Sequence, residues 1–187
     1  MEVLLILEII SVLFNIIFLV LLTKEIKQCW IYGIVGSLLG SFIVYHQGLF
    51  SESILYLFYA FIGVYALIVW HTKSNQIFKI KRLHPFQSII LVASGVLVAV
   101  GLGYMMSKTE ANKPYLDALS TVFGIIATFL EIYKFYIAWV FWIFINCYST
   151  WLYTISDLYP YALQMFVYTL MSIYGLIQWR KKFILQA

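Results

Sequence analysis

A stripe of aromatic and polar residues near the C-terminus holds the side chains best suited to chemistry. Trp139, Trp142 and Asn146 are spaced by three and four residues, which places them on one face of a helix expected over 137–155. The same stripe continues through Ser149, Thr150 and Tyr153. Indole rings stack on flat rings and attract cations, with about 0.5–2 kcal/mol per contact, and an amide can bond hydroxyl groups. The stripe therefore indicates a site for a flat, polar or cationic small molecule.

Each residue of this stripe also has a structural interpretation. Trp139 lies near one end of its expected helix, where tryptophan is enriched because it is amphipathic, so an interfacial belt and a binding role both stay open. Trp142 lies about one turn deeper and is the better site candidate. Asn146 falls near the middle of the helix, where an amide is costly unless paired, so it marks a helix contact or a substrate contact.

Two further expected helices add polar candidates. Gln164 and Tyr168 are four residues apart within 160–179, and Tyr56 and Tyr59 lie within 53–70. Gln164 is also close enough to the outer end of its helix to be an amide in contact with water. Asp117 and Glu131 flank the stretch 116–133 and are interpreted as charges at the membrane interface, with Glu131 able to pair with Lys134.

The composition shows where these helices must lie. The chain has 187 residues, 64% hydrophobic and 11% charged, with a mean hydropathy of +0.94, whereas soluble domains carry about 25% charged residues. An all-α integral membrane protein is expected, because lipid requires backbone hydrogen bonds to be closed within each span. Seven transmembrane helices are predicted, over residues 3–22, 30–46, 53–70, 86–106, 116–133, 137–155 and 160–179.

The distribution of basic residues predicts the orientation. With the N-terminus outside and the C-terminus cytoplasmic, ten lysines and arginines lie on the inner side, and only Lys108 and Lys113 lie on the outer side. The expected location is the bacterial inner (plasma) membrane, with many passes. The basic loop 71–85 is expected to lie against anionic headgroups, and its His71 and His84 do not form a convincing metal site.

Several classes of function are excluded by what the sequence lacks. The net charge of +4 comes from basic residues scattered between apolar runs, unlike a nucleic-acid surface. Cys29 and Cys147 are too far apart in sequence, and too apolar in context, for a disulfide framework or a metal site. There is no phosphate-binding loop and no hydrolase motif. We therefore expect no enzyme activity, no cofactor, no metal and no nucleic-acid partner.

An internal repeat organises the chain. Of the 64 residue pairs from 7/116 to 70/179, all 109 positions apart, 14 are identical, including Trp30/Trp139 and Trp70/Trp179. A three-helix unit ends on the side opposite to its start, so the extra helix at 86–106 is needed for both copies to run in the same direction. The sequence thus predicts a parallel repeat of two three-helix bundles joined by a linker helix (3-1-3). The expected parts are a first repeat (1–70), a basic loop with the linker helix (71–110) and a second repeat (111–187).

The two copies differ in a way that favours the second as the binding half. Trp142 and Asn146 correspond to Gly33 and Ser37 in the first copy. Gly36 and Gly40 have the G-x-x-x-G spacing that allows a close helix approach. We expect the second copy to grip the ligand and the first to supply space and close packing.

Several of these residues together resemble the PnuC-type vitamin transporters, which are similar to the SWEET sugar carriers. The resemblance rests on the 3-1-3 plan, the Trp139-x-x-Trp142-x-x-x-Asn146 stripe, Gln164 ahead of Tyr174-Gly175, and Trp30, and it covers about residues 5–182. It implies facilitated diffusion of nicotinamide riboside for pyridine nucleotide salvage, a cytosolic kinase that traps the product, and a homotrimer. The tryptophan pair and the amides are the implied ligand contacts.

The ligand itself stays open at this stage. Members that carry nicotinamide riboside have a Gln, an Asn and a Tyr-Gly-Trp where this chain has Tyr56, Gly63 and Tyr65-Ala66-Leu67. Thiamine, riboflavin or a deoxynucleoside is the alternative ligand. A membrane subunit that binds a partner and does not transport is a further alternative.

Overall fold

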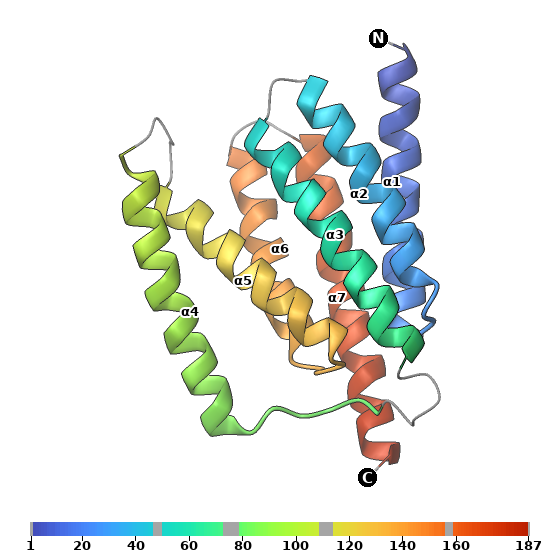
Figure 1. The fold of residues 1–187 in the computed structure, drawn as a ribbon, viewed down its shortest axis with the longest axis vertical. Helices are drawn as coiled ribbons and strands as arrows, with labels where there is room; N and C mark the ends of the chain where they lie inside the picture. The colour runs from blue at the N-terminus through green and yellow to red at the C-terminus, as the bar shows by residue number, and fades with distance from the viewer. Residues whose placement is uncertain (1, 47–49, 73–78, 109–113, 156–158, 187) are drawn as a thin grey trace. The chain divides into compact units, whose positions relative to one another are not determined.

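The computed structural model describes residues 2–46, 50–72, 79–108, 114–155 and 159–186. Within these residues the chain forms seven α-helices and no strand element. The helices are α1 (Glu2–Thr23), α2 (Cys29–His46), α3 (Phe50–Thr72), α4 (Pro85–Met106), α5 (Pro114–Ile132), α6 (Ala138–Ile155) and α7 (Tyr159–Gln186) (Figure 1). The all-helical class and the seven expected helices are confirmed.

Most helix ends fall within a few residues of the expected ends, but the end of α7 differs. The apolar stretch was predicted to end at 179, whereas α7 continues to Gln186 through Arg180, Lys181 and Lys182. Lysine and arginine are good helix formers and are favourable near a helix C-terminus. Hydropathy therefore located the end of the apolar segment and not the end of the helix.

Among the residues that the structure describes, four helices have the length and composition of membrane spans. These segments are Ile6–Thr23, Ser53–Thr72, Pro85–Met106 and Pro114–Ile132, with mean hydropathies of 2.6, 2.0, 2.3 and 1.5. A shorter apolar helix runs over Cys29–Ile43. About 20 helical residues cross a bilayer core, so these segments can span it with little to spare.

The chain divides into two compact units, Met1–Phe78 and Lys79–Ala187. In the first unit α2 packs against both α1 and α3. Two glycines of α2 allow close contact with different helices. A Cβ added at Gly36 would lie 2.6 Å from Asn15 Oδ1 of α1, and one added at Gly40 would lie 2.9 Å from Tyr56 Cε1 of α3. The G-x-x-x-G face is therefore covered from within its own unit.

In the second unit α6 packs against both α5 and α7, and α4 packs against α5. The buried residues of α4 are Gly95, Ala99 and Gly103, one turn apart on one face. Cβ atoms added at Gly95 and Gly103 would lie 2.9 Å from Ile126 and 2.6 Å from Tyr115. Small residues thus let α4 lie close to α5, while its large side chains face outward.

The N-terminus of α4 is capped by its own sequence. The backbone N–H of Phe86 donates to His84 Nδ1 at 3.4 Å, and the backbone N–H of His84 donates to Gln87 Oε1 at 3.2 Å. Pro85 stands at the first helical position, where its missing N–H costs nothing. His84 therefore has a structural use at the start of this helix.

Helices α1 and α5 end in the same way. Glu25 and Lys134 have positive φ angles of 59° and 58°. The N–H of Ile26 donates to Leu21 O at 3.0 Å, and that of Phe135 donates to Leu130 O at 2.8 Å. This six-to-one bond with a left-handed residue is the Schellman termination. It recurs 109 positions apart, at the offset of the sequence repeat.

Candidate functional site

Asn146 lies at the centre of a hydrogen-bonded chain between α6 and α7. Its side chain is 6% exposed, and Nδ2 donates to Ser172 Oγ at 3.3 Å. Ser172 Oγ in turn donates to Tyr168 O at 2.8 Å. The buried amide is therefore paired across the two helices, as a polar group in an apolar span requires. This bond uses one of the two N–H donors of the amide.

Gln164 and Tyr168 extend this chain along α7. Gln164 Nε2 donates to the Tyr168 hydroxyl at 3.0 Å, and both side chains are half-buried. The spacing of four residues brings them together on one face. The structure thus links three of the expected site residues of the second unit, Asn146, Gln164 and Tyr168, through Ser172.

Trp139 is the most buried of the stripe's described side chains. Its ring is 0% exposed and meets Trp179 edge-on, with centroids 5.4 Å apart and planes at 89°. A Cβ added at Gly175 would lie 2.6 Å from Trp139 Cε2, so the glycine is what lets α7 approach the indole. Trp139 forms part of the wall of the second unit.

Trp142 stands one turn further along the same helix. Its ring is half-buried, and its Nε1 is buried without a partner of hydrogen-bond geometry. Thr150, further along the stripe, bonds back to Asn146 O at 2.7 Å. The side chain of Tyr153 lies outside the residues whose side chains are described. Trp142 is therefore half-buried and lies one turn before the buried amide of Asn146.

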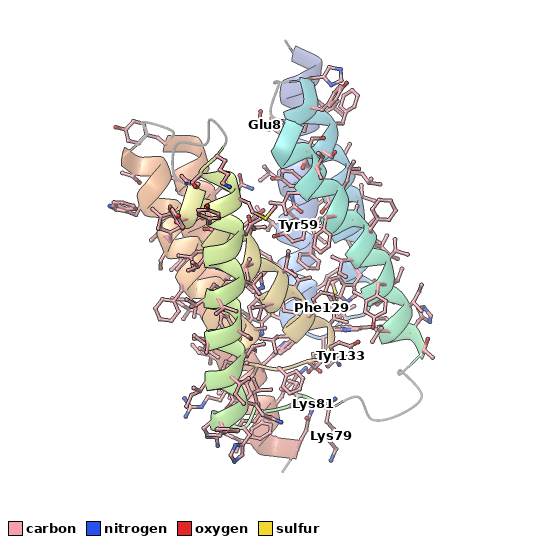
Figure 2. The ribbon with its side chains drawn as sticks, turned by 60° about the vertical axis from the view of Figure 1, so that its left-hand side comes forward. Glu8, Tyr59, Lys79, Lys81, Phe129 and Tyr133 are labelled. Carbon is pink, nitrogen blue, oxygen red and sulfur yellow. The ribbon has the colours of Figure 1, made fainter. Side chains whose placement is uncertain are left out.

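The other two expected site residues, Tyr56 and Tyr59, belong to the first unit. Tyr56 covers Gly40 of α2, and both tyrosine rings are half-buried on α3. Tyr59 lies beside Phe58, with ring centroids 5.9 Å apart, and is labelled on α3 in Figure 2. Both residues are thus placed within their own unit.

Glu131 is a residue that sequence reasoning undervalued. It was interpreted as a charge at the membrane interface, but its side chain is only 3% exposed. Its carboxyl group faces the indole N–H of Trp142. The repeat contained a signal for this burial, because Glu131 corresponds to Leu22, which is 0% exposed. The side chain of Asp117, interpreted in the same way, lies outside those described.

The two amide side chains of the candidate site in the second unit have no amide equivalents in the first. Asn146 and Ser172 correspond to Ser37 and Gly63, and Gln164 corresponds to Leu55. A Cβ added at Gly63 would instead lie 2.9 Å from Ile34. The α2–α3 contact has a different polar pair, Ser41 and Ser53, whose hydroxyl oxygens lie 2.8 Å apart.

Large and small side chains are also exchanged between the units. In the first unit Phe18 of α1 fills the space over Gly33, where an added Cβ would lie 2.9 Å from Phe18 Cδ2. The corresponding pair in the second unit is Ala127 and Trp142. The aromatic ring thus comes from the first helix in one unit and from the second helix in the other.

The basic segment before α4 is anchored within the second unit. The backbone of Lys81 bonds Lys134 O at 2.8 Å and accepts from the Tyr136 N–H at 3.2 Å. The N–H of Ile80 donates to Gln186 Oε1 at 3.0 Å. Figure 2 shows Lys79 and Lys81 at the same end of this unit as Tyr133. Residues 73–78 of the predicted basic loop lie outside the described residues.

No metal centre accompanies these groups within the described part of the chain, where no three His, Cys, Asp or Glu side chains cluster. Both cysteines are free, Cys29 buried and Cys147 exposed. The polar atoms available to a ligand are therefore amides, hydroxyls, indole N–H groups and one buried carboxyl.

These features together define a class: a helical membrane protein with several apolar spans and with buried polar and aromatic side chains in its second unit. The family model for the nicotinamide mononucleotide transporter matches residues 5–181. The chain belongs to this family of membrane transporters.

Individual relatives agree with the family match. The nicotinamide riboside transporter PnuC of Escherichia coli (strain K12) is 21% identical over 178 residues, which cover 80% of this chain and 74% of the relative. That of Neisseria mucosa is 24% identical over 166 residues, 81% of this chain and 63% of the relative. A crystal structure of the vitamin B3 transporter PnuC superimposes with a TM-score of 0.81 at 21% identity, covering 97% of this chain and 83% of that one. The fold is therefore that of this transporter.

Proposed function

We propose that this chain carries nicotinamide riboside across the membrane by facilitated diffusion. The family membership and the names of the relatives support the transporter class and the ligand. The observation that carries the proposal is the buried hydrogen bond from Asn146 to Ser172, one turn along α6 from the half-buried Trp142. The first unit has Ser37, Gly63 and Gly33 at the same positions.

The chemistry of these groups suits a nicotinamide nucleoside. Trp142 can stack on the positively charged pyridinium ring, with about 0.5–2 kcal/mol from the cation–π attraction. Asn146 and Gln164 can bond ribose hydroxyls or the carboxamide. Trp139 and Tyr168 complete the proposed contacts from the second unit, and Tyr56 and Tyr59 are the proposed contacts from the first.

The proposed mechanism is passive. The sequence has no phosphate-binding loop for ATP. A site that holds a cation mainly by aromatic faces and amides binds it moderately, and moderate binding allows release. A cytosolic kinase that phosphorylates the product would then make uptake one-directional.

The proposed architecture is the parallel 3-1-3 repeat, with the N-terminus outside and the C-terminus cytoplasmic in the bacterial inner membrane. Matching structural features at the repeat offset support the duplication. Trp30 meets Trp70 edge-on at 5.7 Å and 80°, as Trp139 meets Trp179. The rings of Phe14 and Tyr32 pair at 5.6 Å, and those of Phe123 and Phe141 at 5.7 Å. A homotrimer stays a prediction from the resemblance.

Two alternatives are a different ligand and a role other than transport. Thiamine, riboflavin or a deoxynucleoside would use the same stacking and amide contacts, so only a binding comparison separates them from nicotinamide riboside. A subunit that binds a partner would need the small-residue face of α2, but Asn15 and Tyr56 already cover Gly36 and Gly40.

A thermal-shift panel in detergent tests the ligand. Purified protein is heated with nicotinamide riboside, nicotinamide mononucleotide, thiamine, riboflavin or a deoxynucleoside, each over a concentration series. Ligand binding to the folded state raises the Tm with concentration, and we expect the largest shift with nicotinamide riboside. A shift with thiamine alone would replace the proposed ligand, and no shift with any compound would favour a non-transporting subunit.

A further inference from the structure

Glu131 brings a carboxyl group into the interior of the second unit. Of the acidic side chains that the structure describes, Glu8 and Glu25 are half-buried and Glu131 alone is buried, with 3% of its surface exposed. Its backbone is fixed by the helix end, because Lys134 N–H donates to Glu131 O at 2.9 Å. A carboxyl group at such a place is costly unless a polar partner meets it.

The polar group that meets this carboxyl is the indole of Trp142. The carboxyl faces this side chain as a hydrogen-bond acceptor. The two groups are not aligned well enough for a full hydrogen bond, because Nε1 of Trp142 is buried without a hydrogen-bond partner. An unpaired buried donor costs about 1–3 kcal/mol.

The first unit shows that packing alone does not require this pair. Glu131 and Trp142 correspond to Leu22 and Gly33. Leu22 is 0% exposed, so an apolar side chain fills this place at the end of α1, and the same helix termination forms around it. The carboxyl and the indole therefore occur together in the second unit, and both are absent at the same positions of the first.

We propose that Glu131 is the positioning residue for Trp142: its carboxyl oxygen accepts the indole N–H and fixes the plane of the ring for stacking on the ligand. This inference rests on the proposed function, in which Trp142 contacts the ligand. An indole held at its N–H presents its face in one orientation, whereas a free indole must be ordered when the ligand binds, and that ordering weakens binding.

A double-mutant cycle tests this role. The variants are Glu131→Leu, which introduces the residue of the first unit, Glu131→Gln, which keeps an acceptor oxygen, Trp142→Phe, which keeps a ring without the N–H, and the double variant Glu131→Leu/Trp142→Phe. The dissociation constant for nicotinamide riboside is measured in detergent. Glu8→Gln serves as the control for loss of a carboxylate in the other unit.

We expect Glu131→Leu to weaken binding about ten-fold and Glu131→Gln about two-fold, as for loss of one hydrogen bond to a charged or polar group. In the Trp142→Phe background, Glu131→Leu should have no further effect. Equal weakening in both backgrounds would overturn the proposal, because Glu131 would then act independently of Trp142.

A second readout does not depend on the ligand. The indole ¹⁵N–¹H resonance of Trp142, assigned by its loss in Trp142→Phe, should shift strongly in Glu131→Leu and weakly in Glu131→Gln, with the other indole resonances in place. An unchanged Trp142 resonance in Glu131→Leu would overturn the proposal. If Glu131→Leu does not fold, Glu131→Met, which keeps the chain length, gives the same comparison. If the wild type binds no nicotinamide riboside, the proposed ligand is wrong. The indole resonance still tests whether Glu131 contacts Trp142.

Discussion

Glu25 and Lys134 share a left-handed backbone conformation, with φ of 59° and 58°, at equivalent positions of the two halves. Neither residue is a glycine, and each follows the last turn of the first helix of its half. The left-handed region costs a non-glycine residue about 1–2 kcal/mol. The same strained helix end therefore occurs twice, 109 positions apart, as the proposed duplication predicts.

Relief of this strain should stabilise both halves alike. Glu25→Gly and Lys134→Gly are each expected to raise the unfolding free energy by up to about 1 kcal/mol, because glycine adopts positive φ without a steric cost. Thermal unfolding in detergent measures the change. Glu25→Val is the opposite control and should lower the Tm. Shifts of opposite sign for the two glycine variants would contradict the equivalence of the helix ends.

Gly175 should be intolerant of a methyl group. Gly175→Ala places a Cβ about 2.6 Å from the ring of Trp139, and overpacking of this kind costs about 1–3 kcal/mol. Gly101→Ala is the matched control, because a Cβ at Gly101 meets nothing within 4 Å and alanine favours the helix. We expect a lower Tm for Gly175→Ala and an equal or higher Tm for Gly101→Ala. Equal Tm values would mean that Trp139 moves aside freely.

The hydrogen bond between Asn146 and Ser172 should couple α6 to α7. Asn146→Ala and Ser172→Ala are each expected to lower stability by about 1–3 kcal/mol, since each leaves a buried polar partner. The double variant should lose about 1 kcal/mol less than the sum of the two. Chemical unfolding of the four proteins measures this coupling. Strict additivity would show that the bond at 3.3 Å contributes nothing.

Much of the fold could be predicted from the sequence, because a segment that spans a lipid bilayer must be apolar, long enough to cross it and hydrogen-bonded within itself. Apolar runs long enough to cross a bilayer are expected to be helices. The sequence repeat also predicted that Trp30 and Trp70 are equivalent to Trp139 and Trp179, and both pairs make an edge-on contact in the structure. The end of α7 was missed because hydropathy reports the lipid boundary, whereas Arg180 to Lys182 continue the helix outside it.

The candidate site could be predicted only in part. The spacing of Gln164 and Tyr168 predicted that they share one face of a helix, and this placement allows the hydrogen bond between their side chains. The bond from Asn146 to Ser172 joins two helices, and no spacing within one helix predicts which side chain on the next will be its partner. The burial of Glu131 was missed because a charged side chain is expected to contact water. Its repeat counterpart Leu22 is apolar and buried, which indicates an interior position.

Uptake into liposomes tests the central claim most directly. Labelled nicotinamide riboside is offered to liposomes that hold the wild type, Trp142→Ala, Asn146→Ala or Trp151→Ala, the last an exposed tryptophan of the same helix. We predict saturable uptake that needs no proton or sodium gradient, reduced about ten-fold or more in the first two variants, as loss of a stacking or amide contact implies, and unchanged in Trp151→Ala. Equal uptake by all four proteins would contradict the proposed site, and accumulation that depends on an ion gradient would contradict the passive mechanism.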